Sequence, residues 1–152
     1  MNLLKISITA AAVLSAITCG SAAAAMDLTP SGPFDPVKDR ARVVYCIQAH
    51  LTPLSFAIET LGMDEQRMMQ NDEVVIRPRF ERLKPFMEAI DAREPKTEGG
   101  LAGEAGRGAL AYTGRWEARA REPGSAEAIL SEMMAESEKC DALVKSWGAP
   151  PA

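Results

Sequence analysis

The spacing of apolar residues along the chain predicts helices rather than strands. Between Asp35 and Gly62, apolar residues recur every three or four positions, which is the repeat of an amphipathic helix. Asp35 and Pro36 suit the start of this helix, Gly62 suits its end, and Pro53 inside it predicts a kink. The expected core stripe comprises Val37, Ala41, Val44, Ile47 or Gln48, Leu51, Leu54 and Ile58.

The next part of the chain predicts a second long helix after a short one. Residues 63–71 have the pattern of a short helix or helical connector, and Asp72 is suited to cap the helix that follows. Pro78 and Pro85 should bend that helix from its outer side, because they lie away from the apolar face. Alternatively, residues 74–77 are extended and the helix begins at Pro78. The expected apolar face comprises Ile76, Phe80, Leu83, Met87 and Ile90.

Two more helices are expected in the second half. The glycine-rich residues 94–108 predict a flexible loop, and their spacing does not match phosphate-binding motifs. A third helix runs from Gly103 or Gly108 to Arg121, and a fourth runs from Ser125 to about Trp147. The third helix should bury Ala105, Ala109, Tyr112, Trp116 and Ala120. The fourth should bury Ile129 or Leu130, Met133, Cys140, Leu143 or Val144, and Trp147.

The first 25 residues have the pattern of a secretory signal. One positive charge precedes a short apolar run, and small residues lead to a predicted cleavage after Ala25. The apolar run is shorter than the ~20 residues that span a membrane, which disfavours a retained anchor. Lipidation at Cys19, giving an anchored lipoprotein, is a further alternative. The expected organisation is a removed signal (1–25), an irregular segment (26–34), one helical domain (35–148) and a tail (149–152).

Two cysteines remain after the predicted cleavage, Cys46 on the first long helix and Cys140 on the last. In an oxidising compartment such a pair usually forms a disulfide. The predicted fold class is therefore all-α, an antiparallel four-helix bundle with its first and last helices joined by a Cys46–Cys140 bond. The competing hypothesis is a metal site formed by Cys46 and His50, which are one helical turn apart.

Charge and composition exclude some function classes. Removal of the signal leaves 16 Lys and Arg against 21 Asp and Glu, a net charge of −5. Such an acidic chain is unsuited to nucleic-acid binding through bulk electrostatics. No second apolar segment is long enough to cross a membrane. The single histidine, His50, and the absence of a G-x-S-x-G motif argue against an enzyme.

Two groups of arginines are the most suggestive surface features. Guanidinium groups beside an aromatic ring suit a carboxylate, a phosphate or an acidic protein surface. The candidate partner-binding residues are Arg77, Arg79, Arg82, Arg115, Trp116 and Arg119. The alternative is that the acidic last helix neutralises these arginines within the bundle. The acids concerned are Glu127, Glu132, Glu136, Glu138 and Asp141.

These features predict a soluble periplasmic binding protein without a cofactor. It would act through a protein partner in the cell envelope, as an envelope-stress accessory protein or an inhibitor. The alternative is a carrier of a small ligand, haem or metal in the bundle interior, with His50 and methionines as ligands. Most methionines should instead fill the core, with Met63 and Met68 expected to be exposed. No motif identifies a family.

Overall fold

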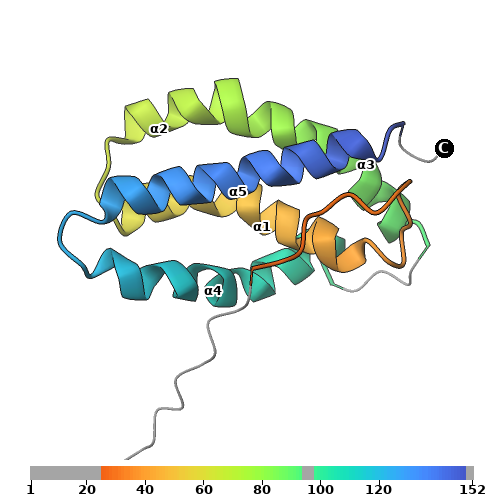
Figure 1. The fold of residues 1–152 in the computed structure, drawn as a ribbon, viewed down its shortest axis with the longest axis horizontal. Coiled ribbons are helices and arrows are strands. Elements are labelled where there is room, and N and C mark those ends of the chain that lie inside the picture. Colours follow the sequence, from red (N-terminus) through yellow and green to blue (C-terminus); the bar gives the residue numbers. More distant parts are fainter. Residues whose placement is uncertain (1–24, 94–97, 150–152) are drawn as a thin grey trace, which may run out of the picture.

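The computed structural model describes residues 25–93 and 98–149, and these contain helices and no strand. The predicted all-α class is therefore confirmed. Except for Ala25, the expected signal segment with Cys19 lies outside the described residues, as does most of the predicted tail. The α-helices are α1 (Arg40–Glu59), α2 (Glu65–Asn71), α3 (Arg77–Asp91), α4 (Gly100–Ala120) and α5 (Ala126–Ser146), and a π-helical turn, η1 (Asp72–Ile76), joins α2 to α3 (Figure 1).

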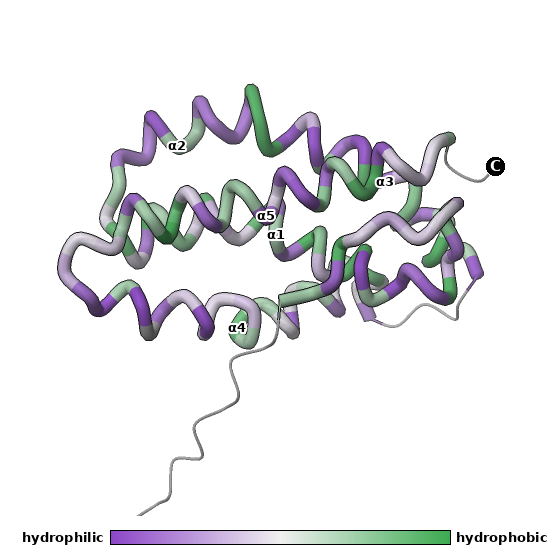
Figure 2. Tube along the Cα trace, viewed as in Figure 1, coloured by the Kyte–Doolittle hydropathy of each residue, from purple (hydrophilic) through white to green (hydrophobic). Residues whose placement is uncertain are grey.

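Helix α1 packs against α3, α4 and α5, and it is the centre of the fold. Figure 1 shows α1 and α5 between α4 and the α2–α3 segment. Because α1 is covered from three sides, it buries a wider face than its apolar stripe predicts. Each helix interleaves hydrophobic and hydrophilic positions (Figure 2), so neighbours decide which of them are covered. The buried residues of α1 are Val43, Tyr45, Cys46, Ile47, Ala49, His50, Pro53, Phe56 and Ala57.

The core stripe predicted for α1 is wrong in its orientation. Of that stripe only Ile47 is buried, whereas Val37 is 77% exposed and Leu51 is 48% exposed. His50, expected at the edge of the core, is fully buried, and so is Pro53, which lies inside the helix. The cause is tertiary, because α5 and α3 cover the side that carries His50.

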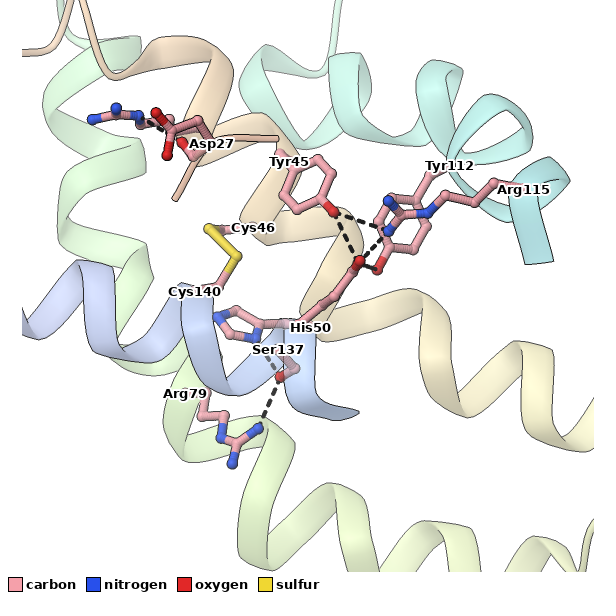
Figure 3. Close-up of a disulfide and its surroundings, with 11 residues drawn as sticks. Asp27, Tyr45, Cys46, His50, Arg79, Tyr112, Arg115, Ser137 and Cys140 are labelled. Carbon is pink, nitrogen blue, oxygen red and sulfur yellow. Dashed lines mark hydrogen bonds and ion pairs between the residues drawn. A yellow bond between two sulfur atoms is a disulfide. The ribbon is translucent and has the colours of Figure 1, made fainter. Parts of the chain in front are cut away.

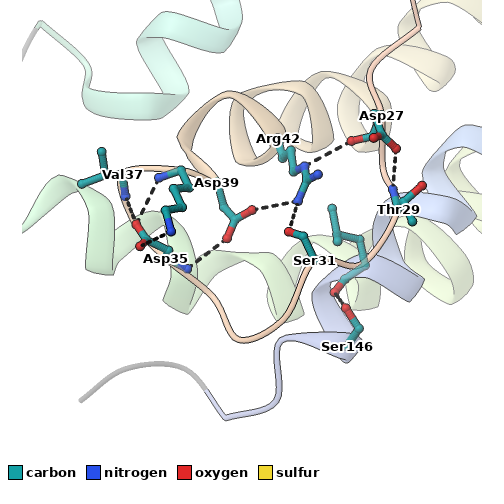
Figure 4. A network of polar contacts seen from close by, with 10 residues as sticks. Asp27, Thr29, Ser31, Asp35, Val37, Asp39, Arg42 and Ser146 are labelled. Atoms are coloured by element: carbon teal, nitrogen blue, oxygen red, sulfur yellow. Dashed lines mark hydrogen bonds and ion pairs between the residues drawn. The ribbon is translucent and has the colours of Figure 1, made fainter.

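Helix α1 begins at Arg40, later than the predicted start at Asp35. The Asp35 carboxylate caps a separate turn, where it accepts the backbone N–H groups of Val37 (2.9 Å) and Lys38 (3.1 Å) (Figure 4). The predicted stop at Gly62 is confirmed, because this residue adopts a left-handed conformation (φ +62°) just beyond the helix.

The segment between α2 and α3 is helical throughout. Asp64 caps α2 by accepting a backbone N–H of its first turn at 2.8 Å. The predicted cap at Asp72 is wrong, because helical backbone continues through η1, and Asp72 pairs with Arg77 at 2.9 Å instead. The extended alternative for residues 74–77 is also wrong. The π-helical spacing accommodates Pro78, whose ring clashes with the carbonyl four residues earlier in a regular α-helix.

Helix α4 begins at Gly100, so most of the predicted glycine-rich loop is helical. Leu101 is fully buried, and its N–H donates to the Asp91 carboxylate at 3.1 Å, which fixes the start of the helix. Gly108 leaves room for the Gln48 side chain of α1, since a Cβ there would lie 2.5 Å from its nitrogen, which donates to the Ala105 carbonyl oxygen at 3.1 Å. The small inner face of α4 therefore has the packing role that its composition predicts.

The predicted faces of the last three long helices are largely confirmed. Phe80, Ala109 and Ala120 are only half-buried. The buried members of these faces are Ile76, Leu83, Met87, Ile90, Ala105, Tyr112, Trp116, Ile129, Met133, Cys140, Leu143, Val144 and Trp147.

The two cysteine side chains meet between α1 and α5. Cys46 and Cys140 are both fully buried, their Cα atoms lie 5.4 Å apart, and their sulfurs are at disulfide-bonding distance (Figure 3). This separation is within the range that disulfides adopt.

Residues 26–34, here called the N-terminal strap, have no regular secondary structure but are tied to the helices. Arg42 donates to the Asp27 carbonyl oxygen (3.1 Å), the Ser31 hydroxyl (2.7 Å) and the carboxylate of Asp39, which directly precedes α1 (Figure 4). At the end of the strap, the Phe34 ring packs against the ring of Trp147. The strap therefore covers one end of the helices.

Candidate functional site

The first polar cluster joins α1, α4 and α5 through the carboxylate of Glu136. Its Oε2 accepts the hydroxyl hydrogens of Tyr45 (2.8 Å) and Tyr112 (3.0 Å) and a short hydrogen bond from Arg115 (Figure 3). The Arg115 guanidinium also lies 4.6 Å from the centres of both the Tyr112 and Trp116 rings. We call Tyr45, Tyr112, Arg115 and Glu136 the tyrosine–arginine cluster.

The tyrosine–arginine cluster holds a full ion pair in a largely enclosed place. Arg115 and Glu136 side chains are only 10% and 15% exposed. Burial raises the pKa of both Tyr45 and Tyr112, so their hydroxyls stay protonated and donate. Burial by itself lowers the pKa of Arg115, but its hydrogen bond to Tyr45 and the charge of Glu136 raise the pKa overall. The cluster therefore consists of one ion pair, Arg115 with Glu136, and two neutral tyrosines that donate to the same carboxylate oxygen.

The second cluster lies beside the cysteines and contains the single histidine. His50 Nδ1 lies 2.8 Å from the Ser137 hydroxyl, and Arg79 donates to the same hydroxyl at 3.1 Å (Figure 3). The Ser137 hydroxyl therefore links the imidazole on α1 to the guanidinium on α3. The buried Nε2 of the imidazole has no hydrogen-bond partner among the described residues.

Ser137 and His50 resemble a nucleophile and base in distance only. Both side chains are fully buried, so neither reaches solvent. The pKa of His50 is lowered to about 4, mainly by burial and also by the positive charges of Arg79 and Arg82, against the opposing charge of Asp141. A closed, neutral histidine of this kind stabilises packing rather than receiving a substrate proton.

The buried histidine predicts a fall in stability at mildly acid pH. Below its ordinary pKa of 6.5, His50 binds a proton in the unfolded chain but not in the folded protein until about pH 4. The unfolded state therefore binds more protons in this window. The free energy of unfolding should fall by about 3 kcal/mol from pH 6.5 to pH 4, as 2.5 units at 1.36 kcal/mol each.

Denaturant unfolding at several pH values would measure this dependence. In His50→Gln the fall between pH 6.5 and pH 4 should disappear, whatever the absolute stability of the variant. The carboxyl of Asp141 loses charge in a lower window, because Arg82 and Lys145 outweigh its burial and lower its pKa below 3.8. An equal slope in both proteins above pH 4 would contradict the assignment to His50.

The arginines predicted to bind a partner are engaged within the chain. Arg82 pairs with Asp141 at 2.7 Å, and Arg119 makes two hydrogen bonds to Glu132 at 2.6 and 2.7 Å. With Arg115 on Glu136, three of the six candidates therefore meet acids of the last helix, as the alternative interpretation predicts. Arg79 and Arg77 also bind inside the chain, to Ser137 and Asp72, and Trp116 is buried. Contact of these residues with a partner stays a prediction.

The described residues contain no group of three or more histidine, cysteine or carboxylate side chains suited to a metal ion. Cys46 contacts Cys140, whereas His50 contacts Ser137. Cys46 and His50 therefore do not converge on a common metal position. The expected exposure of Met68 is wrong. Met68 is 1% exposed and faces the core, whereas Met69 is 49% exposed, because α2 turns the first of the pair inward.

The sequence did not predict a groove that lies between α1 and α4 and carries exposed leucines. Two adjoining hollows of about 350 and 120 Å³ share Leu51, Thr52 and Ala109 as lining residues. Leu110, on the α4 side, is 83% exposed. The sequence signal was present, since Leu51 lies in the apolar stripe of α1, but that stripe was assigned to the core.

The groove also carries uncompensated negative charge. Glu59 of α1 and Glu117 of α4 line the larger hollow, and neither has an ion-pair partner in the part of the chain that the structure describes. By contrast, Glu132, Glu136 and Asp141 of α5 form ion pairs with arginines within the fold. The groove thus combines exposed leucines with two available carboxylates.

No family model, curated protein or solved structure matches this chain. In the described ranges, no helix has both the length and the hydropathy needed to cross a membrane. The groove and the clusters are therefore interpreted from their own geometry.

Proposed function

We propose that this chain is an exported periplasmic protein that folds as an antiparallel four-helix bundle closed by a Cys46–Cys140 disulfide. Export is supported by the signal pattern of residues 1–25, and lipidation at Cys19 is its alternative. The bond is supported by the Cα separation of 5.4 Å between two helices at opposite ends of the sequence. Such a bond suits a chain that works in an oxidising compartment.

We infer that the protein acts by binding a protein partner of the cell envelope through the groove between α1 and α4. The observation that carries this proposal is the exposure of Leu51 and Leu110 on opposite walls of one hollow. Leucines at such a place gain free energy when a partner covers them, about 1.5–3 kcal/mol for a fully buried side chain. Helix-in-groove recognition uses this arrangement.

The charges beside the leucines define the partner further. Glu59 and Glu117 line the same hollow, and neither has a counter-ion among the described residues. A matching segment has an apolar face for the leucines and Lys or Arg beside it, so the proposed occupant is a basic amphipathic helix of the partner. Blocking or presenting such a helix fits an accessory or inhibitory role, with no catalysis by this chain.

Substitution of Leu110 tests the groove. Leu110→Glu should leave the fold intact, because the side chain is 83% exposed, but it should weaken partner binding at least about tenfold, the equivalent of about 1.4 kcal/mol. Val74→Glu is the matched control, since Val74 is 76% exposed on η1, outside the groove. A photo-cross-linker at position 110, but not at position 74, should capture the partner in its native host. The affinity of the purified pair would then be measured for each variant.

Two results would overturn the groove as the binding surface. One is equal affinity of the partner for the wild-type protein and Leu110→Glu. The other is cross-linking from position 74 with none from position 110. Cross-linking of an acidic segment to position 110 would contradict a basic helix as the occupant of the groove.

A further inference from the structure

A second pocket, separate from the α1–α4 groove, lies beneath the N-terminal strap. It measures about 420 Å³, which is within the size range of small-molecule sites. The strap forms one wall, with Met26, Leu28 and Pro30, and α5 forms another, with Ala142 and Leu143. Because Arg42 ties the strap to α1, this wall is held in place in the folded protein.

The pocket contains one preorganised acceptor. Glu136 lines it, and the three donors of the tyrosine–arginine cluster all bind its Oε2. Its other oxygen, Oε1, has no hydrogen-bond partner in the described ranges. Tyr45 and Arg115 therefore hold the carboxylate in position through Oε2, while Oε1 stays available to a ligand.

Helix α5 also supplies a charged donor to the pocket. Lys139 lines it, is exposed, and has no ion-pair partner among the residues described. It follows Glu136 by three positions on α5, so the two side chains lie on the same face of the helix. The remaining carboxylate of the lining, on Asp27, already accepts the backbone N–H of Thr29 at 2.9 Å.

We propose that this pocket binds an apolar α-amino acid in its zwitterionic form. The ammonium group would donate to Glu136 Oε1, the carboxylate would pair with Lys139, and the apolar side chain would lie against Leu28 of the strap and Ala142 of α5. Lys139 would repel a simple cation, and Glu136 would repel a simple anion. Only a ligand with both charges and an apolar body satisfies all three parts of the lining.

Titration with L-leucine, L-leucinamide and N-acetyl-L-leucine tests each part of this proposal. Leucinamide lacks the carboxylate, and the acetylated compound lacks the ammonium group. Followed by amide chemical shifts, leucine should bind saturably and shift the signals of Leu28 and Ala142. Each analogue should bind at least about tenfold more weakly, the equivalent of losing one charged contact.

Variants connect that binding to the pocket. Lys139→Gln should remove the preference for leucine over leucinamide, and Ala142→Phe should abolish binding by filling the pocket. Lys84→Gln is the matched control, because Lys84 is likewise exposed but lies on α3, away from the pocket. Unchanged circular dichroism and melting temperature would show that the variants fold.

Three results would overturn the proposal. One is the absence of a saturable shift up to about 50 mM leucine, a concentration far above the millimolar dissociation constant of a weak site. The others are equal binding of leucine and leucinamide by the wild-type protein, and unchanged binding by Ala142→Phe. The proposal is independent of the α1–α4 groove. Leu110→Glu should therefore bind leucine like the wild-type protein even if it fails to bind a protein partner.

Discussion

Reduction of the proposed Cys46–Cys140 bond is expected to lower the free energy of unfolding by about 4–5 kcal/mol. The two residues are 94 positions apart, and cross-linking so long a loop removes much entropy from the unfolded chain. Both sulfurs are buried between α1 and α5, so the folded packing should persist once the bond is cut. Urea denaturation with and without a reductant would measure the change.

The Cys46→Ser/Cys140→Ser variant provides the control for this experiment. It should match the stability of the reduced wild-type protein, and the reductant should have no further effect on it. A wild-type melting temperature that is the same with and without reductant would rule out the bond. Binding of one Zn²⁺ equivalent by the reduced protein, lost in His50→Gln, would favour the thiol–imidazole alternative.

Arg115→Ala is expected to cost about 3–5 kcal/mol of folding stability. The substitution leaves the Glu136 carboxylate largely enclosed, at 15% exposure, without its counter-ion, and breaking such a pair carries a penalty of this size. It also removes the guanidinium that packs on the rings of Tyr112 and Trp116. Thermal and urea unfolding of the variant would measure the loss.

Arg119→Ala separates burial from charge in this test. Arg119 is on the same helix, also lies over Trp116, and also pairs with an acid of α5, Glu132. Both partners are more than two-fifths exposed, so solvent already screens the pair, and the effect should be much smaller than that of Arg115→Ala. Equal effects of the two substitutions would show that enclosure of the Arg115–Glu136 pair contributes nothing to stability.

The same comparison shows why the sequence could not decide whether these arginines are paired within the fold. The Arg–Trp segment of α4 has the composition of a recognition site, but Trp116 is buried and Arg115 is bound to α5. Sequence reasoning correctly named the acids of the last helix as an alternative partner for these arginines. It could not choose between the two interpretations, because local spacing does not say which helix lies opposite.

Helix α1 provides the second case. Its apolar repeat correctly predicted a helix with a glycine stop, but the stripe assigned to the core includes Leu51, which lines the open groove. The side that α3 and α5 cover carries His50 and Cys46 instead. An amphipathic pattern gives the period of a helix, whereas the covered side depends on the number and position of its neighbours.

By itself, the sequence determined the all-α class, the approximate helix boundaries, the faces of α3, α4 and α5, and which two cysteines lie together. These properties follow from local spacing, from residues that start or stop helices, and from the small number of cysteines. Only the tertiary structure decided that His50 is enclosed and that Glu136 collects three donors on one oxygen. It also decided that the groove with Leu51 and Leu110 stays open, because each of these features joins residues that are distant in sequence and meet only when the helices pack.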